Sequence, residues 1–133
     1  MREILFRGKR ADNGEWVDGN LFIPDKADTP TQICVGTNVV RITYDIIPET
    51  IGQYTGYKID EIKVFENDIA KIHLEIPYLP HKDKAIDDIG IVCFDTDDLR
   101  YYVISNTGKK YAMCYIKEVI GNIHDNPELL GGR

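Results

Sequence analysis

The stretch that decides the fold most clearly is Ile91-Val92-Cys93-Phe94-Asp95-Thr96-Asp97-Asp98-Leu99-Arg100-Tyr101-Tyr102-Val103-Ile104. Two short segments rich in β-branched and aromatic residues, 91–94 and 99–104, flank four polar residues of the kind that form turns. Neither segment places apolar residues at helical spacing. The stretch therefore predicts an antiparallel hairpin with an acidic turn.

The same rhythm continues in both directions along the chain. Asn13-Gly14 can supply the positive φ angles of a tight hairpin turn, and residues 24–31, with two prolines and several polar residues, are typical of a loop. No long window sustains helical spacing, so the sequence predicts a mostly β chain. The further strands are expected at 4–6 with 15–23, at 33–35 with 39–44 around Gly36-Thr37-Asn38, and near 111–115, with the sheet continuing to Ile123.

Two segments depart from this rhythm. Residues 76–88 contain two prolines and many charges, so we expect a long, mobile excursion rather than a central strand. Near the C-terminus, Asn126 can cap a helical turn and Pro127 suits its first position. A short helix there would present Leu129 and Leu130 from one side, as a structural clasp.

Length and composition indicate one soluble globular domain. The chain has 133 residues, of which 43% are hydrophobic and 29% charged. We treat 1–133 as a single domain, with an alternative division into two β subdomains near residue 45. No run is long enough to span a membrane, and the charged start Met-Arg-Glu-Ile-Leu-Phe-Arg is unlike a signal peptide.

Charge and cysteine content restrict the partners. The chain has 22 acidic and 16 basic residues, a net charge of −6, which disfavours nonspecific coating of nucleic acid. Cys34, Cys93 and Cys114 are odd in number, and their spacing fits neither a disulfide framework nor a zinc site. We therefore expect reduced, mostly buried thiols in a cytoplasmic protein.

Candidate chemical groups each have a simpler structural interpretation. The acidic turn 95–98 lacks the glycine and distal glutamate of a calcium loop. His73-Leu74-Glu75 resembles the opening of a zinc deaminase signature, but the Pro-Cys-x-x-Cys half is missing, which favours one face of a strand. Cys93 lies in an apolar run with no histidine nearby in the sequence. No catalytic residue, cofactor or metal ion is predicted.

The most distinctive segment is Pro48-Glu49-Thr50-Ile51-Gly52-Gln53-Tyr54-Thr55-Gly56-Tyr57. Glycines allow close backbone approach and tyrosines offer rigid contact area, so the segment suits either a binding loop or a corner whose tyrosines pack inward. Further on, Asn67 lies at a turn before a strand, where it would take the left-handed conformation. The candidate binding surface consists of Trp16, Gln53, Tyr54, Thr55 and Tyr57.

A series of short motifs runs from one end of the chain to the other: Arg2-Glu3-Ile4, Phe6-Arg7-Gly8, Trp16-Val17-Asp18-Gly19, Glu49 to Gly56, Phe65 to Ile69, Gly90-Ile91-Val92 and Val119 to Leu130. By these motifs the chain resembles the YopX family of phage and prophage proteins. The departures are Lys58 to Val64, where the family commonly has an Asp-x-Asn-Gly type of turn, and Asn67, where it has glycine. The resemblance implies a mostly β fold with small, partly open barrels of SH3-like character and no established activity.

Three hypotheses for function remain open. The leading one is a noncatalytic binding or assembly module, which acts with a protein partner or with copies of itself in the bacterial cytoplasm, and a homo-oligomer is favoured. The second is a nucleic-acid-binding barrel that uses the basic N-terminal tip with Trp16 and Tyr54 as stacking surfaces. The third is an enzyme that uses carboxylates such as Glu66, Asp68 and Asp97.

Overall fold

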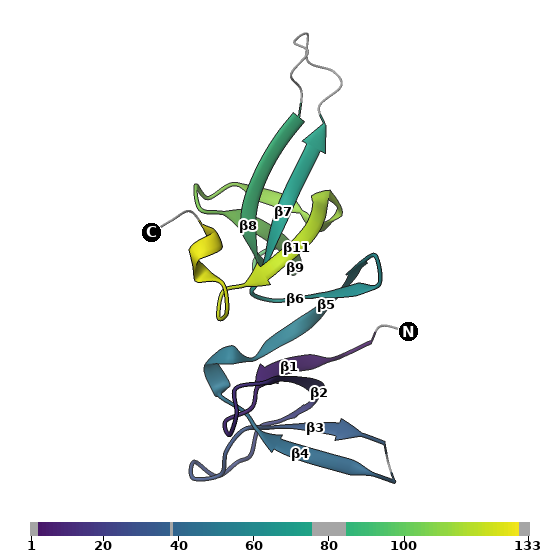
Figure 1. The fold of residues 1–133 in the computed structure, drawn as a ribbon, viewed down its shortest axis with the longest axis vertical. Helices are drawn as coiled ribbons and strands as arrows, with labels where there is room; N and C mark the ends of the chain where they lie inside the picture. Colours follow the sequence, from purple (N-terminus) through teal and green to yellow (C-terminus); the bar gives the residue numbers. More distant parts are fainter. Residues whose placement is uncertain (1–2, 38, 76–84, 131–133) are drawn as a thin grey trace. The chain divides into compact units, whose positions relative to one another are not determined.

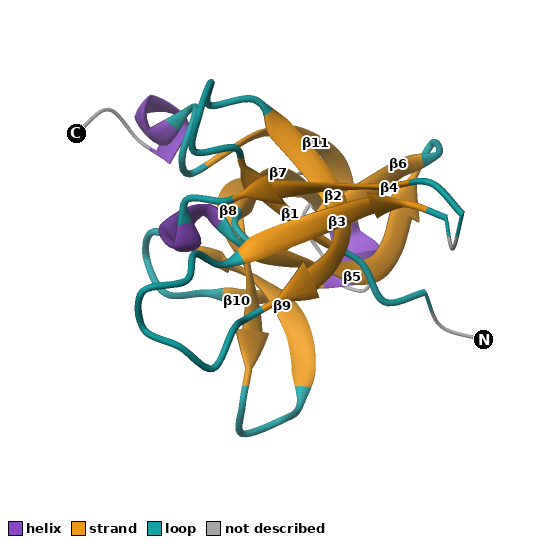
Figure 2. Cartoon of the chain, turned by 90° about the horizontal axis from the view of Figure 1, so that it is seen from below, coloured by secondary structure: helices purple, strands orange, loops and turns teal. Residues whose placement is uncertain are grey.

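A computed structural model describes residues 3–37, 39–75 and 85–130, and it is built almost entirely from strands (Figures 1 and 2). Helical structure within these residues is confined to the short 3-10 turns η1 (Pro48–Thr50), η2 (Met113–Tyr115) and η3 (Pro127–Leu130). The prediction of a mostly β chain with a short C-terminal helical turn is confirmed. The strands are β1 (Phe6–Lys9), β2 (Trp16–Phe22), β3 (Gln32–Gly36), β4 (Arg41–Asp45), β5 (Gly52–Ile59), β6 (Ile62–Phe65), β7 (Asp68–Glu75), β8 (Ala85–Asp95), β9 (Arg100–Ser105), β10 (Lys110–Ala112) and β11 (Ile116–Asn122).

The chain divides into two compact units, Met1–Gly56 and Tyr57–Arg133. The division lies within β5, C-terminal to the place near residue 45 that the sequence suggested. Strand β5 begins beside β1 in the first unit and continues into the second, where it pairs with β6. Both sheets are antiparallel and open, and no closed barrel forms among the described residues.

The first unit is a meander whose strands lie in the order β4-β3-β2-β1-β5. Because side chains alternate across a sheet, the register places Gly8 and Ile33 on one face and Arg7 and Trp16 on the other. The first of these faces carries the core, with Ile33 fully buried. A β-carbon at Gly8 would lie 2.5 Å from the Ile46 side chain, so the glycine makes room for this packing.

The second unit is a sheet in the order β10-β9-β8-β7-β11. The hairpin predicted at 91–104 is confirmed as the C-terminal half of β8 paired with β9, with Val92 opposite Val103. Strand β11 returns from the end of the chain to pair with β7. Apolar side chains from six elements form one buried cluster, which consists of Val64, Ala70, Ile72, Val92, Val103, Tyr111 and Ile116.

One predicted loop is partly wrong. The sequence predicts an excursion at 76–88, but Ala85 to Asp88 belong to β8, a central strand. The rest of the predicted excursion, 76–84, lies outside the described residues. The strand tolerates its two aspartates because both have partners. Asp87 contacts His73 Nδ1 at 2.8 Å, and Asp88 accepts a hydrogen bond of 2.8 Å from the Tyr111 hydroxyl.

Positive φ angles mark the tight turns. Asn67 has φ of 71°, as predicted, and its backbone is bound from both sides, to Val92 O at 2.9 Å and from Ile123 N at 3.0 Å. Gly14 has φ of 74° in the first hairpin. Between β5 and β6, Asp60 and Glu61 have φ of 50° and 69°, so residues without the usual glycine or asparagine form this two-residue turn.

The C-terminal turn differs in one detail from the prediction. Asn126 does not cap η3 with its side chain, because its Oδ1 accepts a hydrogen bond from Asn122 N at 3.3 Å. Asn122 Oδ1 in turn accepts from His124 N and Asp125 N, at 3.0 and 2.9 Å, and so holds the closing segment in a tight bend. Leu129 and Leu130 are half-buried and line a cavity of about 590 Å³ with Ile72 and Ile89, among others. Whether they act as a clasp stays a prediction.

Candidate functional site

The candidate site is the open side of β4 together with the two residues before it, Val39 and Val40, and we call it the β4 edge. β4 is the outermost strand of its sheet and pairs only with β3 on its inner side, as the hairpin in Figure 1 shows. An edge strand presents a row of backbone groups to which another strand can bind. The β4 edge is therefore a preformed template for strand addition.

The direction of the backbone groups follows from the hydrogen bonds at the two ends of the hairpin. Ile46 N donates to Thr31 O at 3.0 Å, and Val40 O accepts from Thr37 N at 2.8 Å, so both residues point toward β3. Backbone groups of a strand alternate between its two sides. The N–H and C=O groups of Arg41 and Thr43 consequently point outward, and no described residue pairs with them.

The open edge ends at Asp45. Ala11 N donates to Asp45 O at 2.8 Å, and Ile47 N donates to Lys9 O at 2.9 Å. These bonds accompany an isolated bridge between Arg10 and Ile46, which is the nearest approach to barrel closure in this unit. The edge available to an incoming strand is therefore short and runs from Val39 to Thr43.

Apolar side chains along this edge are exposed rather than packed. Val39 is 90% exposed, Val40 66% and Ile42 54%. Phe22 and Ile23, at the end of β2, are also exposed, at 55% and 68%. Such a concentration of apolar surface in one small unit is typical of an interaction site.

A shallow hollow lies beside the edge, on the face of the sheet opposite the core. Its volume is about 500 Å³. Gly36 has no side chain to fill it, and Phe22 and Arg41 belong to its lining. The full lining is Asn20, Leu21, Phe22, Cys34, Gly36, Thr37 and Arg41.

The five residues predicted as a binding surface do not share one face. Trp16 is half-buried, with Arg7 Cζ 4.7 Å and Lys9 Nζ 5.5 Å from its ring centroid. Gln53 lies opposite Phe6, so the register puts it on the other face of the sheet from Trp16. As a binding surface this set stays a prediction.

The tyrosines of the distinctive segment pack inward. Tyr54 is only 6% exposed, and its backbone N–H donates to Leu5 O at 2.8 Å. Tyr57 packs against the apolar cluster of the second unit, while Thr55 is half-buried. The corner interpretation of this segment therefore describes it better than the binding loop. The nucleic-acid hypothesis stays a prediction. Because Tyr54 is almost fully buried, it offers little ring surface on which a base could stack.

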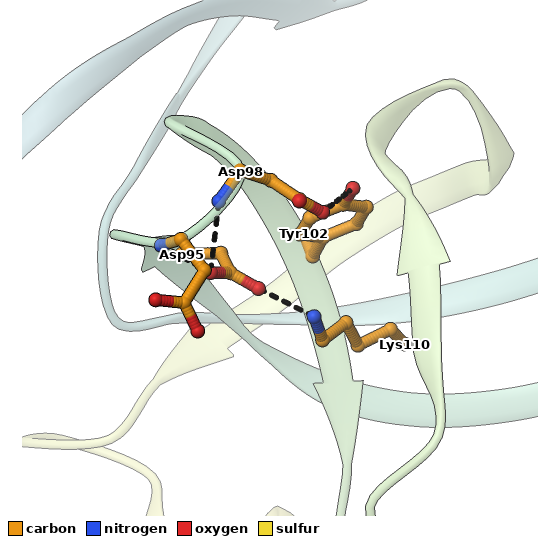
Figure 3. Close-up of polar contacts among 5 residues, drawn as sticks. Asp95, Asp98, Tyr102 and Lys110 are labelled. Atoms are coloured by element: carbon orange, nitrogen blue, oxygen red, sulfur yellow. Dashed lines mark hydrogen bonds and ion pairs between the residues drawn. The ribbon is translucent and has the colours of Figure 1, made fainter.

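The acidic turn between β8 and β9 is a structural network, shown in Figure 3. Asp95 Oδ1 accepts from Asp97 N at 2.8 Å and Asp98 N at 3.3 Å, and its Oδ2 is bound by Lys110 Nζ. The Tyr102 hydroxyl donates to Asp98 at 2.7 Å. Lys110 and the two N–H groups lower the pKa of Asp95, and Asp95 raises the pKa of Lys110. These carboxylates close a turn.

His73 lies on the outer face of β7, as the strand interpretation predicted, and contacts two carboxylates. Nδ1 lies 2.8 Å from Asp87 Oδ1 and Nε2 lies 3.6 Å from Glu75 Oε1. Hydrogen bonds to Asp87 and Glu75 raise the pKa of His73. No group of three or more His, Cys, Asp or Glu side chains that could hold a metal ion occurs among the described residues.

The remaining nucleophile and carboxylate candidates have ordinary structural surroundings. Burial raises the pKa of the half-buried Cys93 thiol, which disfavours the reactive thiolate. All three cysteines are unpaired, as expected, but the expectation of mostly buried thiols is wrong. Cys34 and Cys93 are half-buried, and Cys114 is exposed because it lies in the surface turn η2. Asp68 is 2% exposed and accepts a hydrogen bond of 2.8 Å from Phe65 N, which fixes the turn at Asn67.

Comparison with known proteins identifies the family. A family model described as YopX protein matches residues 5–131, nearly the whole chain, and the chain therefore belongs to the YopX family. No curated protein and no solved structure matches. Among the described residues there is no helix of the length and apolar character needed to cross a membrane.

The β4 edge was not singled out in the sequence. The run Val39 to Tyr44 was predicted as a strand, and its alternation of apolar and polar residues was visible. The sequence does not show the order of the strands in the sheet, and this order places β4 at the edge. The one available signal was the run of two valines directly after a glycine turn, since apolar residues there have little sheet to cover them.

Proposed function

We propose that this chain is a noncatalytic protein-binding module that takes up an extended segment of a partner protein at the β4 edge. One observation carries the proposal: the outward N–H and C=O groups of Arg41 and Thr43 lie between apolar side chains that are 54–90% exposed. Strand addition satisfies the backbone groups and covers the side chains in one step. The resemblance to phage and prophage proteins supports a role in the cytoplasm of a bacterial host.

The test uses the direction of a single N–H group. Thr43→Pro removes an outward donor without breaking the β3–β4 ladder, because the Thr43 N–H does not point toward β3. Thr43→Val keeps the donor and serves as the matched control. All three chains are used to capture proteins from a lysate of the organism that encodes them, after melting curves establish that each is folded.

The expected result is a set of proteins captured by the unchanged chain and by Thr43→Val but lost with Thr43→Pro. Capture of the same proteins by all three chains would contradict the proposal. The SH3-like character of the fold and a homo-oligomer through other surfaces are compatible with this function and stay predictions.

A further inference from the structure

The β4 edge also selects its partner by charge, an inference that rests on the proposed function. We propose that the strand which adds to β4 comes from a different protein, carries an acidic residue opposite Arg41 and a β-branched residue opposite Ile42, and that a second copy of this chain is rejected there.

The first argument concerns the neighbour of Arg41 within its own sheet. The residue directly opposite it in β3 is Gly36, which has no side chain. Gly36 has φ of 125°, and a β-carbon there would lie 2.2 Å from Val40 O, so no larger residue fits. Within the described residues Arg41 makes no ion pair. The positive charge of Arg41 is therefore available to a side chain of a strand that pairs with the open side of β4.

The second argument concerns the chemistry of directly opposed residues. Opposed side chains in an antiparallel pair lie about 5 Å apart, and opposite charges, β-branched pairs and threonine pairs all stabilise such contacts. Ile42 lies on the apolar face, where Val35 is its neighbour in β3. An incoming strand that alternates apolar and polar residues, with an acidic residue facing Arg41, matches this row.

The third argument excludes a second copy. When two β4 strands pair in antiparallel fashion about a twofold axis, the same residue of both copies lies at the axis. Each possible register is therefore defined by the residue at that position. With Arg41 on the axis, the two arginines oppose each other, which is destabilising. With Ile42 or Thr43 on the axis, Val39 or Arg41 of the second copy falls opposite Asp45, where Ala11 N already bonds to Asp45 O at 2.8 Å. With Val39 or Val40 on the axis, Thr37 or Val39 of the second copy falls opposite Arg41, so neither arginine gains an acidic partner.

The experiment uses two capped peptides, Thr-Val-Glu-Val-Thr and Thr-Val-Lys-Val-Thr, which differ only in the residue expected to face Arg41. Binding is measured from the NMR shifts of the Arg41 and Thr43 amides. Cross-strand charge pairs predict that the Glu peptide binds the unchanged chain about 2- to 30-fold more tightly than the Lys peptide. In Arg41→Glu the preference should reverse.

Two controls separate this inference from the proposed function. Thr43→Pro, in which the Arg41 amide is the remaining reporter, should abolish binding. A Glu peptide with methylated backbone nitrogens should independently abolish binding to the unchanged chain. If both peptides bind equally and the controls abolish binding, the charge selection is wrong and the protein-binding function stands. If neither peptide shifts the two amides, strand addition at β4 itself is refuted.

The exclusion of a second copy has its own readout. Light scattering of the unchanged chain should show no assembly that depends on this edge, so any oligomer should be the same in Thr43→Pro. A dimer that Thr43→Pro dissociates and Thr43→Val preserves would overturn the exclusion.

Discussion

The two units differ in how many of their apolar side chains they bury. In the second unit most of them gather in one buried cluster that includes Val64, Ile72, Val92 and Val103, although Ile62 and Leu99, in or beside turns, are exposed. Among the described residues of the first unit, only Ile33, Ile46 and Tyr54 are buried hydrophobics, while Phe22, Ile23, Val39, Val40 and Ile42 are more than half exposed.

The second unit therefore covers most of its apolar side chains by itself, whereas the first leaves several for a partner to cover under the proposed function. Exposed apolar side chains contribute little to the stability of the isolated chain, and covering them by a partner recovers that contribution. The second unit also ties its charges into local networks, as at Asp95 and Lys110, whereas the first leaves Arg41 without an ion-pair partner among the described residues. If the proposed function holds, stability and partner binding are concentrated in different parts of the chain.

The sharpest test of this contrast compares two isoleucines. Ile72→Ala, in the buried cluster, should lower the free energy of unfolding by about 2–5 kcal/mol, because it leaves a cavity in a packed core. Ile42→Ala, at the β4 edge, should change it by less than about 0.5 kcal/mol. Urea unfolding of both variants measures the difference. Equal losses would mean that the β4 edge is part of a core after all.

A second test addresses the turn that starts β7. Asn67→Val should destabilise the chain by about 1–2 kcal/mol, because a β-branched residue fits poorly at φ of 71°. Asn67→Gly should be neutral or slightly stabilising and serves as the control. Thermal melts of both variants measure the effect. An Asn67→Val chain with the melting temperature of the parent would contradict the claim that a β-branched residue is strained at position 67.

A third, smaller effect is expected at the hairpin between β5 and β6. Glu61→Gly should stabilise the chain by up to about 1 kcal/mol, because glycine relieves a left-handed strain of about 1–2 kcal/mol at φ of 69° and adds an entropic cost of about 0.5–1 kcal/mol. Gly56→Ala, at φ of 89° in β5, should destabilise the chain. Chemical denaturation of the two variants checks both signs.

The smallest effect depends on pH. His73 has its pKa raised above the ordinary 6.5 by Asp87 and Glu75, so its charged form stabilises the folded chain. That stabilisation is fully present below pH 6.5 and is lost as the pH rises through the raised pKa. The difference in melting temperature between the parent and His73→Gln should therefore shrink with rising pH. A difference that grows with pH would contradict the contact with Asp87.

Local features of the fold could be predicted because they depend on neighbouring residues. The hairpin at 91–104 follows from two apolar segments around an acidic turn, and Asn67 follows from the need for a left-handed residue before β7. Ala85 to Asp88 could not be assigned correctly, because the partners that make their charges tolerable, His73 and Tyr111, come from other strands.

The candidate site depends on long-range information of the same kind. Exposure of Val39, Val40 and Ile42 follows from the position of β4 at the outside of the sheet, which no local pattern records. Tyr54 could not be separated from a binding residue for the corresponding reason, since a tyrosine in a glycine-containing segment suits a surface or a core equally well. The order of the strands in the sheet determines both the exposure of the β4 side chains and the burial of Tyr54.

The pairing of β11 with β7 has a consequence for how the chain is synthesised. Every other neighbouring pair in that sheet joins strands that follow each other in sequence, but β7 must wait for residues 116–122 before its second neighbour exists. The first unit needs nothing beyond residue 56 for its own contacts and can fold early on the ribosome. The β4 edge therefore forms while β7 still lacks its last partner, and the unit with the larger buried cluster is the last to be completed.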